Sequence, residues 1–298
     1  MPIVKMQRIL DHALRNHYAV GYFEAWDLYS LEAALEAAEE ARAPAILGFG
    51  AAVTNGAWYD RNGVEAMSAL AVTLAQRAEV PAAVLFNEAQ TYAQAVRGLA
   101  GGCNAVMLDS SHLPVAEHES ATRDLVQVAH ALGAAVEAEL GHLANAGDPS
   151  HVAAATDPAD AVRFVDATGI DALAVAIGNV HIMTAGEADV DLDLLERIHT
   201  AVPLPLVIHG GTGFPRRAIA TAVRLGAAKF NVGTVLKQEF LGGVKAAAGD
   251  QAGAEAGIHA LMGSRDAHDV MLQGKLRMKA KILELMELYG SVGRAPAF

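Results

Sequence analysis

The sequence is poor in cysteine and in positive charge. Its single cysteine, Cys103, excludes an intrachain disulfide framework and fits a reducing compartment such as the cytoplasm. The 298 residues include 22 Lys and Arg against 34 Asp and Glu, which gives a formal net charge of −12 at pH 7. A nucleic-acid surface needs concentrated Lys and Arg, so this charge argues against nucleic-acid binding.

Long apolar runs are also missing. No stretch approaches the ~18 uninterrupted apolar residues that indicate a membrane-spanning helix. Residues 1–16 mix charged and apolar side chains and lack the continuous apolar core of a signal peptide. We therefore expect a cytoplasmic protein with no membrane association.

Apolar residues are abundant, and many of them are small or aliphatic. Hydrophobic residues make up 53% of the chain and charged residues 19%, so a large buried core is possible. The length allows one large α/β barrel or two ordinary domains.

Eight short apolar runs recur along the chain, and longer segments with helical periodicity lie between them. Strands that are apolar throughout are typical of parallel sheets, which are buried on both faces. Strict alternation of strand and helix gives right-handed crossovers, and eight such units can close a (β/α)8 TIM barrel. An open doubly wound sheet is the alternative, but eight regular units without an early G-x-G-x-x-G favour closure. The runs are Ala19–Ala25, Ala43–Phe49, Ala82–Glu88, Ala105–Ser110, Ala135–Gly141, Ala172–Gly178, Pro205–Gly211 and Ala227–Gly233, and the helical segments include Leu28–Ala41, Val64–Arg77, Ala116–Leu132, Pro158–Thr168, Leu192–Ala201 and Pro215–Leu225.

Three segments lie outside this alternation, within what we expect to be a single α/β barrel domain over residues 1–298. Val4–His17 predicts a helix that caps the bottom of the barrel. Gly249–Gly263 is rich in Ala and Gly and predicts a loop. Ala267–Leu288 predicts a long amphipathic helix, more than a barrel needs, which suggests packing against another subunit.

Two histidines follow apolar strands of neighbouring units. In a barrel of this kind the functional residues lie at the carboxyl ends of the strands, where His181 and His209 are expected. With a carboxylate from across the mouth they would form a two-histidine, one-carboxylate site with open positions, typical of a catalytic zinc; cobalt or manganese could also occupy it. The alternative is that each imidazole hydrogen-bonds a backbone carbonyl in its loop.

The segment 209–215 is a glycine-rich turn that leads into a helix. Uncovered backbone N–H groups and the positive end of a helix favour a phosphate there, and the last two strands of barrels often hold one. Asn231 and Thr234 would add side-chain donors from the neighbouring loop. A tight turn with a helix cap explains the same residues without a ligand.

Several long motifs in one order resemble the class II, metal-dependent aldolases that cleave fructose- or tagatose-bisphosphate, and the similarity runs nearly from end to end. The resemblance implies that His181 and His209 are metal ligands. It also implies that Gly210, Gly211 and Thr212, together with Asn231, Gly233 and Thr234, hold the phosphate and the ketone end of the substrate. The motifs are Ala105–Pro114, Val136–Gly141, Leu173–His181, Pro205–Gly213, Lys229–Thr234 and the tail Tyr289–Ala295.

The departures from the family pattern concern its proton carriers. The family's catalytic Asp and third metal His are replaced by Asn87 and Glu88, and its mobile loop Glu is replaced by Gly147. Glu88 can still bind a metal through oxygen, which would give a Glu88, His181 and His209 site. Asn87 can hydrogen-bond but cannot exchange a proton near neutral pH.

Two further departures lie elsewhere. Ile182 stands where the family has a phosphate-binding Gly, and near the first strand Glu24 stands where the family has an Asn. Asp148, beside the missing loop Glu, and Glu24 are candidates to replace the lost acids. Glu139 would orient a ligand or offer the metal an alternate position. We therefore take Asn87, Glu139 and Asp148 as the candidate catalytic residues.

Three functions fit these residues. The leading hypothesis is a metal-dependent carbon–carbon lyase, most simply with Zn2+, that cleaves a sugar phosphate, modified sugar or sugar acid other than ordinary fructose-bisphosphate. The metal would polarise a ketone and stabilise the enediolate formed on cleavage. A metal-dependent isomerase or epimerase, and a non-catalytic ligand binder, are the alternatives. The resemblance and the long carboxyl-terminal helix suggest a homodimer or homotetramer.

Overall fold

A computed structural model of the chain describes residues 3–50, 54–146, 153–249 and 257–297. Its centre is a closed barrel of eight parallel strands, in the order β1-β10-β9-β7-β5-β4-β3-β2. Each of the eight predicted apolar runs coincides with one of these strands to within a few residues, so the predicted (β/α)8 barrel is confirmed. The strands are β1 (Val20–Phe23), β2 (Ala45–Gly50), β3 (Ala82–Ala89), β4 (Ala105–Leu108), β5 (Ala135–Leu140), β7 (Ala172–Val175), β9 (Leu206–Ile208) and β10 (Ala227–Val232).

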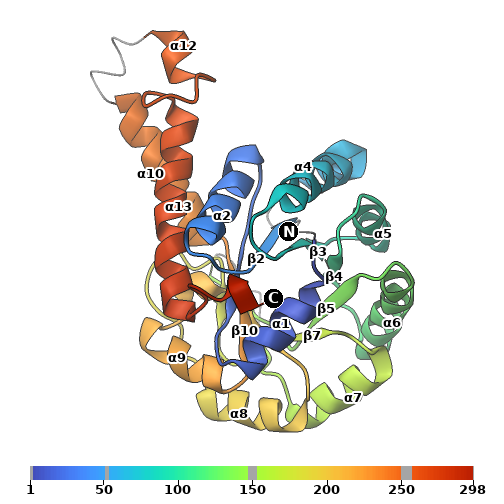
Figure 1. The fold of residues 1–298 in the computed structure, drawn as a ribbon. Helices are drawn as coiled ribbons and strands as arrows, with labels where there is room; N and C mark the ends of the chain where they lie inside the picture. Colours follow the sequence, from blue (N-terminus) through green and yellow to red (C-terminus); the bar gives the residue numbers. More distant parts are fainter. Residues whose placement is uncertain (1–2, 51–53, 147–152, 250–256, 298) are drawn as a thin grey trace.

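Helices surround the barrel (Figure 1). Side-chain caps fix where several of them begin: Asp27 accepts from the backbone N–H of Ser30, and Asp157 precedes Pro158 at the first helical position. The helices are α1 (Met6–Arg15), α2 (Leu28–Glu40), α3 (Gly56–Trp58), α4 (Val64–Arg77), α5 (Tyr92–Ala100), α6 (Val115–Ala131), α7 (Pro158–Thr168), α8 (Leu192–Ala201), α9 (Arg216–Arg224), α10 (Thr234–Gly249), α12 (Ile258–Leu261) and α13 (Val270–Tyr289), with a π-helical turn η1 (Tyr59–Gly63) and 3-10 turns η2 (Gly211–Gly213) and η3 (Ala295–Ala297).

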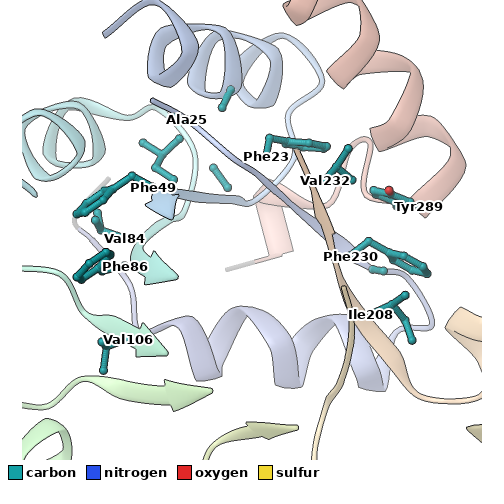
Figure 2. Close-up of a cluster of buried hydrophobic side chains, with 14 of the residues drawn as sticks. Phe23, Ala25, Phe49, Val84, Phe86, Val106, Ile208, Phe230, Val232 and Tyr289 are labelled. Atoms are coloured by element: carbon teal, nitrogen blue, oxygen red, sulfur yellow. The ribbon is translucent and has the colours of Figure 1, made fainter. Parts of the chain in front are cut away.

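The main core lies between the barrel and its surrounding helices. Aromatic rings dominate part of it: Phe49 stacks on Phe86, and Phe230 stacks on Tyr289, each with ring centroids 4.7 Å apart (Figure 2). These side chains are almost completely buried. Their packing joins the strands to the helices and holds the strand ends in fixed positions.

The amino-terminal end of the barrel is closed by α1, as predicted. Met6, Ile9 and Leu10 of this helix are fully buried in a second apolar cluster. Their neighbours inside the barrel include small residues at the starts of strands, such as Ala105 and Ala135, which leave room for them. With this end filled, the carboxyl ends of the strands are left for a site.

A pair of helices, α10 and α13, projects beyond the barrel with α12 near its tip (Figure 1). They pack extensively on each other, and α13 also packs on α2. The predicted loop Gly249–Gly263 is wrong at Gly249, which is the last residue of α10, and at Ile258–Leu261, which form α12; residues 250–256 lie outside the described part. Helix α10 itself was not predicted. No described helix is long and apolar enough to span a membrane.

A two-stranded parallel sheet that the sequence pattern does not show lies beside the barrel. Strand β6 (Ala144–Asn145) pairs with β8 (Val180–His181), so that Asn145 lies opposite His181. This pairing fixes the backbone at His181, beyond the end of β7.

Candidate metal centre and active site

The structure brings together the three residues that the sequence analysis assigned to a metal. Glu88 lies in β3, His181 in β8, and His209 directly after β9. One potential ligand atom from each residue lies within 4.8 Å of the others. Side chains at this spacing can share one cation. The rings of His181 and His209 are stacked, with centroids 5.6 Å apart.

An unusual backbone conformation directs Glu88 into the cavity. Successive residues of a strand normally face opposite sides, yet Asn87 and Glu88 both line the same cavity. Glu88 has φ of +50°, in the left-handed region, and the register of β3 against β4 shifts between Phe86 and Ala89. The irregularity turns the Glu88 side chain to the side that Asn87 faces.

His209 is held on its far side by a buried chain of charged groups. Its Nε2 lies 3.0 Å from Oε1 of Glu137, whose other carboxylate oxygen pairs with the ammonium of Lys229. All three side chains are almost completely buried. Since the carboxylate can only accept, Nε2 of His209 carries the proton and Nδ1 is left to face the cavity.

The Nδ1 atom of His209 faces two carboxylates. It lies 3.2 Å from Oε1 of Glu88 and 3.1 Å from Oε2 of Glu139. Neither contact has the geometry of a hydrogen bond, so Nδ1 and Oε2 of Glu139 are buried without a partner in the described structure. An imidazole lone pair and two carboxylates that converge in this way need a positive charge between them. The donor set therefore fits a divalent cation bound by nitrogen and oxygen.

The pKa shifts of Glu88 and His209 also indicate that a positive charge between these side chains is favoured. Burial alone would raise the pKa of Glu88, but its contact with His209 and the charges of His209, His181 and Lys229 lower it to about 2. Burial would lower the pKa of His209, yet its carboxylate neighbours Glu137, Glu139 and Glu88 raise it well above the ordinary value. Without metal, a proton on His209 takes the place of the cation.

The end of β5 is fixed by a buried histidine that the sequence analysis left unassigned. Nε2 of His118 donates to the backbone carbonyl of Glu139 at 3.0 Å, and Nδ1 accepts from the hydroxyl of Ser110 at 2.8 Å. The His118 ring also stacks on Phe164. These contacts hold the backbone of Glu139 where its carboxylate reaches His209.

A cavity of about 560 Å³ opens over the three candidate ligands. Most of the residues predicted to bind phosphate lie on its wall. Gly211 is an exception, because it is buried in the 3-10 turn behind the wall. Asp148 lies outside the described residues. The predicted residues on the wall are Gly210, Thr212, Asn231, Gly233 and Thr234.

The wall also contains an ion pair between Glu24, directly after β1, and a lysine of α10. Oε2 of Glu24 lies 2.9 Å from the ammonium of Lys237 in α10. The Lys237 ammonium also lies 5.7 Å from the centroid of the Trp26 ring. Ile182, which replaces the family's Gly, is partly exposed on the same wall with φ of +57°.

Sequence reasoning missed Glu137, Lys229, Tyr22 and Lys237. Glu137 and Lys229 could have been found, because a charged residue inside an otherwise apolar strand has to be paired. Tyr22 in β1 is uncharged, so no charge distinguishes it from the apolar residues of the strand. Lys237 lies in a helix that was not predicted.

Comparisons with known proteins agree with this fold and site. The family described as "Fructose-bisphosphate aldolase class-II" matches residues 4–294. The protein YdjI of Escherichia coli (strain K12) is 33% identical over 290 residues, which cover 96% of each chain. A "Probable fructose-bisphosphate aldolase" of Bacillus subtilis (strain 168) is 36% identical over 238 residues, 78% of this chain and 82% of that protein.

Solved structures are similar to this chain in their three-dimensional fold. The crystal structure described as "the YdjI aldolase from Escherichia coli K12" has a TM-score of 0.81 at 31% identity, covering 98% of this chain and 99% of that one. A putative fructose-1,6-bisphosphate aldolase from Coccidioides immitis has a TM-score of 0.82 at 26% identity, covering 98% of each chain. The chain belongs to the class II fructose-bisphosphate aldolase family. It is an aldolase-type lyase, and the resemblance seen in its sequence is confirmed.

Proposed function

We propose that this enzyme cleaves a carbon–carbon bond of a ketose-type sugar, sugar acid or sugar phosphate by a metal-dependent retro-aldol reaction. The observation that carries the proposal is the convergence of Glu88, His181 and His209 within 4.8 Å at the mouth of the barrel. Enzymes of this family generally depend on a divalent metal, and this triad is the group of described residues suited to hold one.

The two-histidine, one-carboxylate donor set suits Zn2+ best, and Mn2+ or Co2+ can replace it. When bound, the metal supplies Lewis-acid stabilisation of the negative charge that develops on the substrate's ketone oxygen. Glu137 holds His209 in the tautomer that leaves Nδ1 free, and Lys229 keeps Glu137 ionised by lowering its pKa against the effect of burial. Glu139 lies beside His209 as an additional oxygen donor.

The remaining predicted residues are proposed to bind and orient the substrate. Asn87, adjacent to Glu88, has a buried side-chain oxygen without a partner and can hydrogen-bond a substrate hydroxyl. The turn and strand-end residues around Gly210, Thr212 and Asn231 line the same cavity. Asp148, which lies outside the described residues, remains a candidate proton carrier.

Ordinary fructose-bisphosphate is not the proposed substrate. General acid–base assistance contributes roughly 10²- to 10⁴-fold in rate, and Asn87 cannot provide it. The cleavage therefore requires a different proton carrier and, with it, a differently placed substrate.

Metal analysis tests the proposal. Protein purified without chelator should contain about one divalent ion per chain, and a chelator should abolish cleavage in a screen of phosphorylated and unphosphorylated ketoses and 2-oxo acids. His181→Ala should lose the ion, whereas His259→Ala, an exposed histidine of α12, should keep it. Absence of bound metal together with activity that resists chelation would refute the proposal. Hydrogen exchange from deuterated water without aldehyde release would indicate an isomerase instead.

A further inference from the structure

The charges on the cavity wall do not favour a phosphate. Three carboxylates line the described cavity, those of Glu24, Glu88 and Asp109, against one lysine and no arginine. A divalent cation would balance this formal excess of two negative charges. A phosphate monoester would bring up to about two more, and no described cation on the wall is free to meet them.

The single lysine is already occupied. Its ammonium lies 2.9 Å from Glu24, whose side chain is 17% exposed, while the Lys237 side chain is 37% exposed, so the pair is partly shielded from solvent. Burial raises the pKa of Glu24 above its ordinary value, and the nearby Lys237 only partly offsets this. For Lys237 to bind an incoming anion, it would have to leave a buried carboxylate without its partner.

The amino terminus of α10, where an anion would be expected, is filled from within the chain. The carboxylate of Glu24 lies against the α-carbon of Gly233, in the space that a β-carbon on that residue would take. The hydroxyl of Thr212 accepts from the backbone N–H of Val235 at 3.2 Å. A carboxylate and a hydroxyl of the protein thus lie at the end of the helix that an anion would approach.

Apart from His209, whose Nδ1 faces the proposed metal, the described buried groups on this wall that lack a hydrogen-bond partner are uncharged. Tyr22, Asn87 and Asn231 are exposed by only 2%, 3% and 7%. The hydroxyl of Tyr22, Oδ1 of Asn87 and both polar side-chain atoms of Asn231 have no hydrogen-bond partner in the described structure. Buried polar groups in native proteins are nearly always paired, so three orphans on one cavity indicate a ligand. Hydroxyls and amides match sugar hydroxyl and carbonyl groups.

We propose that the substrate is an unphosphorylated polyhydroxy ketone or 2-oxo compound, recognised by Tyr22, Asn87 and Asn231, and that the Glu24–Lys237 pair excludes phosphate from the amino terminus of α10. This inference rests on the proposed function, because the substrate is placed over the same metal. In this proposal Glu24 selects against negatively charged substrates. The three neutral side chains bind the hydroxyl groups of the substrate.

Binding of inorganic phosphate tests whether the Glu24–Lys237 pair excludes phosphate from the amino terminus of α10. Metal-loaded wild-type protein should bind phosphate only weakly by calorimetry, with a dissociation constant above about 10 mM. Glu24→Gln should bind it at least ten-fold more tightly, because one negative charge is removed and Lys237 is released. The double variant Glu24→Gln/Lys237→Met should lose that gain. Glu32→Gln, which removes an acid from a different ion pair with a lysine and an arginine outside the cavity, should behave as wild type.

A comparison of ketoses with their 1-phosphates tests whether the cavity recognises an unphosphorylated substrate. D-tagatose and D-fructose should be cleaved or bound in preference to their 1-phosphates by at least ten-fold in kcat/KM or dissociation constant. Tyr22→Phe keeps the ring, so it should fold and retain its metal, yet bind the preferred ketose at least ten-fold more weakly.

Two results would overturn the inference. The first is sub-millimolar phosphate binding by wild type that Glu24→Gln leaves unchanged or weakens. The second is a preference for the phosphorylated ketoses. Metal content and chelator sensitivity are measured on the same samples, so either result can occur while the metal-dependent lyase proposal stands.

Discussion

Glu137 lies directly behind His209, with Oε1 of the carboxylate 3.0 Å from Nε2 of the imidazole, deep inside the barrel. Partners of this kind fix the orientation and the basicity of a metal-binding histidine, and their loss typically costs 10- to 100-fold in metal affinity. Glu137→Gln should therefore weaken Zn2+ binding by about that factor in a chelator competition assay. Glu187→Gln, which removes a surface carboxylate paired with Arg217, is the control and should bind zinc normally. Equal affinities for the two variants would mean that Glu137 does not support the metal.

The metal-free protein should lose stability in acid partly through Glu88. Its pKa is about 2 in the folded protein against an ordinary value of 4.5, so its ionised form stabilises the fold. That contribution is complete above pH 4.5 and is lost as the pH falls towards 2. Glu88→Gln should therefore show a shallower loss of unfolding free energy between pH 4.5 and 3 in urea titrations. Parallel curves for the two proteins would contradict this.

Cys103 should resist alkylation while the protein is folded. The thiol is buried beside the Ser68 hydroxyl at 3.4 Å, and burial raises its pKa from 9 to about 11. Only the thiolate reacts, and at pH 8 its fraction is then on the order of 10⁻³. Iodoacetamide should label the native protein far more slowly than the urea-unfolded protein at the same pH. Labelling at comparable rates would show that Cys103 is accessible and ionised.

Two adjacent glycines of α10 should respond differently to alanine. A β-carbon on Gly243 would lie 2.5 Å from the backbone oxygen of Gln273 in α13, and the backbone cannot easily move. A β-carbon on Gly242 would meet only the flexible end of Arg277, 3.2 Å away. Gly243→Ala should lower the unfolding free energy by about 1–3 kcal/mol, whereas Gly242→Ala should be neutral or stabilising by up to about 1 kcal/mol. Urea unfolding of both variants would show whether the helices pack this closely.

The strands of the barrel could be predicted because their burial on both faces leaves a continuous apolar signal. Helix α10 could not, because Gly242 and Gly243 lower its helical propensity, and the reason for Gly243 is its contact with a helix about 30 residues further along the chain. Local sequence does not contain that information. The loop predicted at Gly249–Gly263 was wrong at its first residue because the helix that ends there was not predicted.

The histidines of the site could be predicted because parallel strands bring their carboxyl ends together. The position of Glu88 was inferred only through the family resemblance, since alternation along β3 would direct its side chain away from that of Asn87. Glu24 was noticed as a departure, but its pairing with Lys237 depends on a contact between residues 213 positions apart. Charge selection at the cavity is therefore a property of the folded chain rather than of any single motif.

Because the backbone of Glu88 is left-handed, we expect glycine to destabilise the protein less than alanine at this position. In an ordinary strand alanine is better accommodated than glycine, but a residue with a β-carbon at φ of +50° carries a strain of roughly 1–2 kcal/mol that glycine escapes. Among variants that have lost the carboxylate, Glu88→Gly should thus unfold at higher urea than Glu88→Ala. The enzyme keeps a strained residue at a position where glycine would relieve the strain but would leave the proposed cation without an oxygen ligand.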